Sequence, residues 1–432
     1  MSLHANLEFE FEARAAEVPR RTPGLKAPFG EQLLAFDEFG KKTVLTETVA
    51  AADGGKAWSV PTYVNEFWTA KQRAANRLHE ISYRACFKPQ LPRFFIERLT
   101  EPGDVVHDPF MGRGTTLIEA ALLGRVPCGC DVSPLSLVLT RPRLRPPTLE
   151  QIRDRLAEID FKTGEETPED LLVFFHPETL REIAALKRHL RDRGTLDAVD
   201  EWIALVALNR LTGHSAGFFS VYTLPPNQAV SVKSQRKINA DRHQTPPRRN
   251  VPELIFKKSQ ILLKDCDDRT RARLRAAAEK SVLLNRPADD TAAIPDGSVS
   301  LVVTSPPFLD VVDYAGDNWL RCWFLGIDPK GVKLTVPKRL DEWRGEMTAV
   351  FRELRRVLRP GGRIAFEVGE VRRGVIKLEE TVLDCGMAAG LRAELILIND
   401  QEFTKTANCW GVDNNAKGTN TNRIVLFARS KT

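Results

Sequence analysis

Ser300-Leu301-Val302-Val303 runs directly into Thr304-Ser305-Pro306-Pro307-Phe308, and this stretch decides how the chain folds. The apolar run predicts a strand of a parallel sheet that is buried on both faces. Two consecutive prolines cannot continue a strand ladder, so they present the Ser305 hydroxyl and the Pro306 carbonyl at the strand's carboxyl end. With the Phe308 ring beside them, these acceptors suit a planar ring bearing an amino group, such as a nucleobase taken out of its stack. A Pro-Pro turn that only closes a core strand is the alternative.

A second stretch, Asp104-Val105-Val106-His107-Asp108-Pro109-Phe110-Met111-Gly112-Arg113-Gly114-Thr115-Thr116, predicts a strand, a turn with two glycines and a helix over 117–123. The glycines let the backbone approach a ligand closely, and the helix N-terminus supplies unpaired N–H groups. Leu117 stands where the dinucleotide fingerprint needs its third glycine, and no Gly-Lys-Ser/Thr follows, which disfavours both nucleotide-phosphate loops. The next predicted strand, 126–130, ends at Asp131, about 20 residues after the glycine turn, where doubly wound folds place an acceptor for a ribose diol. A helix cap is the alternative role for Asp131.

Together the two stretches resemble the S-adenosylmethionine-dependent amino methyltransferases of DNA. The shared signatures are a Ser/Asp/Asn-Pro-Pro-aromatic tetrapeptide and an Asp-Pro-Phe-x-Gly-x-Gly-Thr-Thr cofactor loop. The resemblance implies catalytic roles for Ser305, Pro306, Pro307 and Phe308. It implies S-adenosyl-L-methionine as cofactor, bound by Asp108, Pro109, Phe110, Gly112, Gly114, Thr115, Thr116, Asp131 and Asp290, with Asp289 the second choice for the acid that contacts the adenine. Residues 79–90 resemble the family segment that packs on the methionine end of the cofactor. Arg113 departs from the family's small residue and could pair with the cofactor carboxylate or with DNA phosphate.

The family resemblance also implies a target base. Serine in first place of the tetrapeptide usually accompanies N4-cytosine methylation, whereas Asp or Asn usually accompanies N6-adenine methylation. We therefore expect a site-specific DNA methyltransferase acting on the N4 of a flipped cytosine, with N6-adenine DNA methylation or RNA amino methylation as alternatives. A nucleic-acid-binding protein on a degenerate methyltransferase fold is the non-enzyme alternative. Double-stranded DNA is the expected partner, RNA is less favoured, and a cognate restriction endonuclease is left open.

Composition bounds these predictions. The chain has 432 residues, 42% hydrophobic and 28% charged, which suits a catalytic domain with a substantial insertion. We expect a cytoplasmic protein, because no apolar run approaches a membrane span and the first residues lack a signal pattern. The seven cysteines are scattered without metal-ligand spacing, so neither a metal nor a disulfide framework is expected. Pro127-Cys128 resembles the nucleophile of cytosine C5 methyltransferases, but it falls inside a predicted strand, and we reject covalent catalysis there.

The predicted fold is α/β, a Rossmann-like doubly wound methyltransferase sheet, mostly parallel with an antiparallel last strand, plus a helical inserted domain. Residues 1–78 form an N-terminal extension, in which 7–12 could be an edge strand. Residues 79–145 and 281–432 form the catalytic domain. Within the latter we expect strands at 281–284, 363–368, 392–397 and 423–428, and helices at 319–325, 347–358 and 376–389.

The insert, 146–280, has helical spacing at 149–156, 177–190, 198–211 and 268–280 and is the expected target-recognition region. Inside it, 231–250 predicts a basic loop, with six Lys/Arg against one acid. The expected DNA-binding residues are Lys233, Arg236, Lys237, Arg242, Arg248 and Arg249. A merely solvated loop is the alternative.

Overall fold

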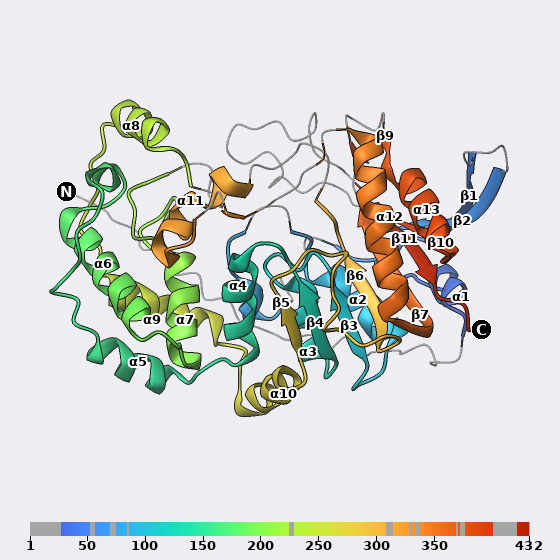
Figure 1. Cartoon of the computed structure of the whole chain (residues 1–432), viewed down its shortest axis with the longest axis horizontal. Coiled ribbons are helices and arrows are strands. Elements are labelled where there is room, and N and C mark those ends of the chain that lie inside the picture. Colours follow the sequence, from blue (N-terminus) through green and yellow to red (C-terminus); the bar gives the residue numbers. More distant parts are fainter. Residues whose placement is uncertain are drawn as a thin grey trace, which may run out of the picture.

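The computed structural model describes residues 27–51, 57–69, 75–83, 86–223, 229–307, 314–328, 331–332, 337, 339–368, 370–371, 376–400 and 421–431. The predicted edge strand at 7–12, Phe308 and most of the Asn-rich loop after residue 404 lie outside these ranges. Figure 1 shows a central sheet, with a group of helices at one end and a strand hairpin at the other. No helix in the described ranges is long and apolar enough to cross a bilayer.

A nine-stranded mixed sheet forms the centre, in the order β1-β2-β10-β11-β7-β6-β3-β4-β5. Strands β5, β4, β3, β6 and β7 are mutually parallel, and β11 is antiparallel to both β7 and β10. The predicted doubly wound sheet with an antiparallel closing pair is therefore confirmed. The strands are β1 (Val44–Ala51), β2 (Ala57–Asn65), β3 (Val105–Asp108), β4 (Val126–Cys130), β5 (Val282–Leu284), β6 (Val299–Thr304), β7 (Leu358–Val368), β10 (Arg392–Asp400) and β11 (Thr421–Ala428). A separate pair consists of β8 (Glu370–Val371) and β9 (Ile376–Lys377).

Strand β6 shows why its sequence is continuously apolar. Leu301 and Val303 pack with the aromatic residues of α2 on one face, and Val302 packs against α12 and α13 on the other. All six residues of β6 are buried, as a central strand covered by helices on both faces requires. The helices near the sheet are α1 (Phe29–Leu34), η1 (Arg77–His79), α2 (Gln90–Leu99), α3 (Thr115–Leu122), α4 (Pro134–Leu144), α12 (Leu340–Val357) and α13 (Leu378–Ala388). Helix α11 (Tyr314–Leu325) lies in the group of helices at the end of the sheet, where Leu320 and Phe324 join their apolar cluster.

The hairpin β1–β2 extends this sheet. Strand β2 pairs in parallel with β10, and the Asn399 side-chain oxygen of β10 accepts from the amides of Phe67 (2.7 Å) and Trp68 (3.1 Å). The expected division at residue 78 therefore does not coincide with a structural boundary, because part of the predicted extension is built into the sheet.

The helical part lies beside β5 and packs around one apolar cluster that includes the fully buried Trp202. Its helices are α5 (Leu149–Glu158), η2 (Glu169–Val173), α6 (Pro177–Asp192), α7 (Ala198–Leu208), α8 (Val232–Asp241), α9 (Val251–Leu262) and α10 (Asp268–Glu279). The predicted basic loop is wrong in its first half, because residues 232–241 form α8. Its N-cap Ser231 accepts from the Ser234 amide, and Gln235 is buried and donates to the Tyr222 carbonyl, so local polar bonds replace the missing apolar stripe.

Candidate functional site

The glycine turn and the double-proline corner follow neighbouring strands and are hydrogen-bonded to each other. Strands β3 and β6 are parallel, so the loops after them leave the same edge of the sheet. The Thr304 hydroxyl, one residue before Ser305, donates to the Asp108 carboxylate at 2.6 Å. The Thr116 hydroxyl, just inside α3, donates to the Val303 carbonyl at 3.0 Å. The glycine turn and the double-proline corner therefore form one continuous structure.

Asp108 lies at the centre of this junction. Its side chain is buried, and burial raises its pKa to about 7. Hydrogen bonds from Thr304 and from the Phe110 amide (3.1 Å) act in the opposite direction, because they favour the carboxylate. Asp108 therefore holds both loops and keeps a proton affinity far above that of an exposed aspartate.

The glycine turn requires glycine for two separate reasons. Gly112 (φ 47°) and Gly114 (φ 74°) have left-handed backbones, which side chains disfavour. A Cβ on Gly114 would also collide with the Thr140 hydroxyl oxygen on α4. Gly114 caps α3 without a side-chain bond, which leaves the helix's first N–H groups at the turn. This geometry fits the close backbone approach expected of a cofactor loop.

Asp131 lies at the end of β4, as predicted, and faces the glycine turn. One carboxylate oxygen accepts from the Gly112 amide at 2.9 Å and the other accepts from the Ser133 amide at 2.8 Å. Burial raises its pKa, whereas these amide bonds oppose the shift. A carboxylate has about four acceptor sites, so acceptor capacity remains for a ribose diol. Asp131 caps the turn before α4 through the Ser133 amide, and its ribose-binding role stays a prediction.

Asp289 and Asp290 are both exposed in the turn after β5, and Asp290 pairs with Arg286 at 3.2 Å. The structure leaves the adenine role of Asp290 a prediction. Sequence reasoning missed Asn285, whose side-chain amide donates to the carbonyls of Asp131 and Val132, each at 2.9 Å. Asn285 thereby holds the loop after β5 against the loop after β4.

Ser305 has a partner that sequence reasoning also missed. Thr304 is in register with Phe366 of β7, so the residues that follow them, Ser305 and Glu367, are neighbours at the carboxyl edge. The Ser305 hydroxyl hydrogen-bonds the Glu367 carboxylate, which also accepts from the Asn422 amide at 2.9 Å. Glu367 is buried, and burial raises its pKa, whereas the two hydrogen bonds lower it. A glutamate inside the apolar run of β7 was the signal that could have found it.

The double-proline corner is held from the α12 side. Pro306 is buried and Pro307 is partly buried. The Nε1–H of Trp343, which is fully buried in α12, donates to the Pro307 carbonyl at 3.2 Å. The expected stacking role of Phe308 falls outside the described residues.

Arg113 binds protein acceptors. Its guanidinium donates to the Ile81 carbonyl at 2.9 Å and to the Thr115 hydroxyl at 3.1 Å. The fully buried Arg143 donates in turn to the Arg113 and Leu78 carbonyls. The two arginines fasten the segment around residues 78–81 over the glycine turn, a role that was not among those considered for Arg113.

Cys128 is unsuited to nucleophilic catalysis. It is buried in β4, and burial raises the pKa of its thiol to about 12. At neutral pH it is a neutral thiol, which agrees with the rejection of covalent catalysis there.

Several of the predicted DNA-binding arginines are already paired. Arg236 pairs with Asp170, and Arg248 pairs with Glu178 and Glu182. The guanidinium of Arg242 stacks 3.8 Å from the centre of the Tyr222 ring. On α8, Lys233, Arg236 and Lys237 are all exposed. Arg249 is partly buried beside α6, where its backbone amide donates to Thr179. A DNA role for this set stays a prediction.

A strand order of this kind, with a glycine turn and an acid after adjacent strands, defines a methyltransferase-type α/β fold. Residues 42–136 match the family model described as DNA methylase, N6_N4_Mtase. This segment, which contains the glycine turn and Asp131, is that of the amino DNA methyltransferase family, whose cofactor is S-adenosylmethionine. The match ends before Ser305.

Similar curated proteins are type II methyltransferases. M.MjaII of Methanocaldococcus jannaschii is 34% identical over 83 residues, 19% of this chain and 16% of that protein. M.BsoBI of Geobacillus stearothermophilus is 23% identical over 278 residues, 59% of this chain and 53% of that protein. The chain thus spans about half or less of the length of these relatives.

Among solved structures, the rRNA methyltransferase aviRa of Streptomyces viridochromogenes is 14% identical, with 82% of this chain and 90% of that chain covered and a TM-score of 0.33. A Thermus thermophilus protein assigned as a DNA modification methylase, solved with S-adenosyl-L-methionine, is 24% identical, with 33% and 53% covered and a TM-score of 0.21. The fold assignment therefore depends on the strand order itself.

Proposed function

We propose that this protein is a DNA methyltransferase that modifies the exocyclic N4 of cytosine in a flipped base. The observation that carries the proposal is the hydrogen-bonded junction between the two motifs. The Thr304 hydroxyl donates to the Asp108 carboxylate at 2.6 Å, and this bond holds the double-proline corner beside the glycine turn. Support for the methyltransferase class comes from the family segment at 42–136 and from the curated relatives. The choice of cytosine depends on serine at position 305.

The residues at the turn fit S-adenosylmethionine, which supplies an electrophilic methyl group when bound. The left-handed Gly112 and Gly114 give backbone access, and Asp131 has acceptor sites left for a ribose diol. Asp290 remains the proposed acceptor for the adenine amino group.

Ser305 and Pro306 hold the amino group of the target base. Because the Ser305 hydroxyl donates its hydrogen to Glu367, its oxygen lone pairs remain to accept an amino hydrogen. The Pro306 carbonyl accepts the second hydrogen. These bonds favour a more tetrahedral nitrogen, with its lone pair freed from the ring, and the donors and acceptors are in place beforehand. Serine is a poor general base, so the proton leaves to water afterwards.

Ser305→Ala tests this assignment. We expect turnover to fall strongly with S-adenosylmethionine affinity nearly unchanged. Ser298→Ala, at the other end of β6 where the hydroxyl donates to the Pro295 carbonyl, is the matched control and should keep full turnover. A Ser305→Ala protein that loses cofactor binding and keeps turnover would overturn the roles.

Nucleoside mass spectrometry of DNA from cells that express the protein tests the product. N4-methylcytosine supports the proposal, and N6-methyladenine selects the adenine alternative. Methylation of purified RNA but not of DNA selects an RNA amino methyltransferase. Absence of S-adenosylmethionine binding in calorimetry favours a nucleic-acid-binding protein without activity. A cytoplasmic location and a cognate restriction endonuclease remain part of the prediction.

A further inference from the structure

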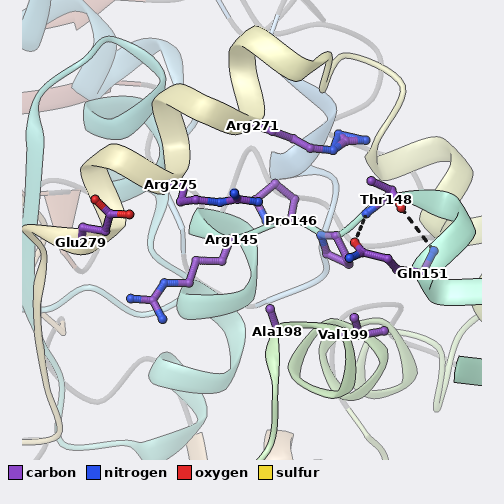
Figure 2. Close-up of a pocket in the computed structure, with 10 residues that line it drawn as sticks. Arg145, Pro146, Thr148, Gln151, Ala198, Val199, Arg271, Arg275 and Glu279 are labelled. Carbon is purple, nitrogen blue, oxygen red and sulfur yellow. Dashed lines mark hydrogen bonds between the residues drawn. The ribbon is translucent and has the colours of Figure 1, made fainter.

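A cavity of about 420 Å³ lies away from the site described above. Helix α4 starts after β4, beside Asp131, and ends near Arg145, and α10 leads into the amino end of β5. Residues at the end of α4 and on α10 therefore border the sheet edge opposite to Ser305. Figure 2 shows the cavity between the turn 145–148, α10 and the start of α7.

Three arginines line this cavity: Arg145, Arg271 and Arg275. Within the described part of the chain, none of the three forms an ion pair. Arg271 is held by a bond from its Nη1 to the Cys266 carbonyl at 2.7 Å, and its Nε is buried with no acceptor among the described residues. Glu279 is the one acid in the lining, so the guanidinium groups outnumber it by two. An excess of guanidinium groups over carboxylates, with no ion pair to these arginines among the described residues, favours an anionic ligand.

The remaining lining residues favour the same kind of ligand. The Thr148 hydroxyl accepts from the Gln151 amide, and the Gln151 side-chain oxygen accepts from the Thr148 amide, at 3.2 and 2.9 Å. These two reciprocal bonds form a capping box at the start of α5, which uses the side-chain oxygen of Gln151 as an acceptor and leaves its NH₂ group as a donor. Pro146 and Pro147 are buried and form a rigid apolar wall.

We propose that this cavity binds a small phosphate monoester, of the size of a sugar phosphate. Guanidinium groups bind phosphate oxygens through paired N–H donors, and Gln151 adds another donor. Glu279 accepts from hydroxyl groups of the sugar, which packs against the proline wall. A volume of about 420 Å³ exceeds what an inorganic ion needs and lies in the range of small-ligand pockets. This proposal does not depend on the proposed methylation.

A phosphate of the DNA backbone shares this chemistry, so the experiment must separate the two sources. The cavity borders the sheet edge away from Ser305, which favours a free ligand over the duplex whose base is flipped at the opposite edge. Ribose 5-phosphate is a suitable probe, because it lacks the base that the cofactor or target pocket would bind.

The test is calorimetric titration of the full chain, saturated with S-adenosylmethionine, with ribose 5-phosphate, ribose and inorganic phosphate. We expect ribose 5-phosphate to bind, ribose not to bind, and both Arg145→Ala and Arg275→Ala to weaken binding about tenfold or more. Arg269→Ala removes an exposed arginine of α10 outside the cavity and should leave affinity unchanged.

Four results would overturn the proposal. The first is no binding of ribose 5-phosphate to the native protein. The second is equal affinity of all three variants for ribose 5-phosphate, and the third is an affinity of the native protein for ribose 5-phosphate no greater than for inorganic phosphate. The fourth is displacement of ribose 5-phosphate by a short DNA duplex whose own affinity falls in Arg275→Ala, which would make the cavity a backbone contact. Melting temperatures of the variants, expected to be unchanged for the exposed Arg145 and Arg275, distinguish loss of the site from loss of the fold.

Discussion

Replacing Glu367 by glutamine separates the activity of the site from the stability of the fold. In the structure the Glu367 carboxylate receives hydrogen bonds from the Ser305 hydroxyl and the Asn422 amide, and burial raises its pKa. Glutamine keeps the shape and one acceptor oxygen but removes the negative charge. Ser305 then loses the charged acceptor that orients its hydroxyl.

The magnitude follows from the charged hydrogen bond. Bonds to a charged group contribute about 1.5–3 kcal/mol. Since 1.4 kcal/mol is about a factor of ten, Glu367→Gln should slow methyl transfer by about 10- to 100-fold.

The free energy of unfolding should increase in Glu367→Gln, although the rate of methyl transfer falls. A carboxyl with a raised folded pKa contributes stability below its unfolded pKa, and this contribution is lost as the pH rises through the folded pKa. Relative to the native protein, Glu367→Gln should therefore be more stable at about pH 8, with the gain disappearing towards about pH 4.

The assay is the single-turnover rate of methyl incorporation into DNA at saturating cofactor, together with thermal unfolding across pH. Glu201→Gln is a matched control, because Glu201 on α7 also has a pKa raised by burial and pairs with Arg141 rather than with the site. Its transfer rate should equal that of the native protein. A native rate in Glu367→Gln, or an equal loss in both variants, would refute the positioning role.

Three further predictions concern the junction. Asp131→Ala removes the acceptor of the Gly112 amide, so the dissociation constant of S-adenosylmethionine in calorimetry should rise about tenfold or more, with the rate at saturating cofactor nearly kept. Trp343→Phe keeps a ring in α12 but loses the bond to the Pro307 carbonyl; single-turnover kinetics should show a rate reduced by up to about tenfold, and weakened cofactor binding at a native rate would contradict this. Asp108 has a pKa of about 7 in the folded protein, so the free energy of unfolding of the native protein should fall as pH rises from about 4 through 7. Asp108→Asn should flatten this dependence of unfolding on pH. A flat profile for the native protein would contradict the argument that burial raises the pKa of Asp108.

Elements whose ends are marked by particular nearby residues, such as glycine, proline or aspartate, were predictable from the sequence. The strand 126–130 was predicted with both ends correct, because Gly124 precedes it and Asp131 follows it. The two motif loops were predictable for the same reason, since glycines and prolines restrict the backbone where they stand.

Features that depend on distant partners were not predictable. Glu367 is a single polar residue in an apolar strand, and its contact with Ser305 follows only from the register of β6 on β7. Helix α12 begins at Leu340, seven residues before the predicted start at Met347, and the earlier turns include the buried Trp343. In α8, capping and a buried glutamine support the helix, and composition alone indicated a loop.

The attachment of β2 to β10 sets an order of events during synthesis. Phe67 and Asn399, which are bonded in the finished protein, are 332 positions apart. The hairpin therefore leaves the ribosome long before its neighbour exists, and this edge of the sheet can close only after nearly the entire chain has been made. A nonsense mutation between Asn65 and Arg392 consequently releases a fragment in which β2 keeps its partner β1 but leaves its other edge without β10.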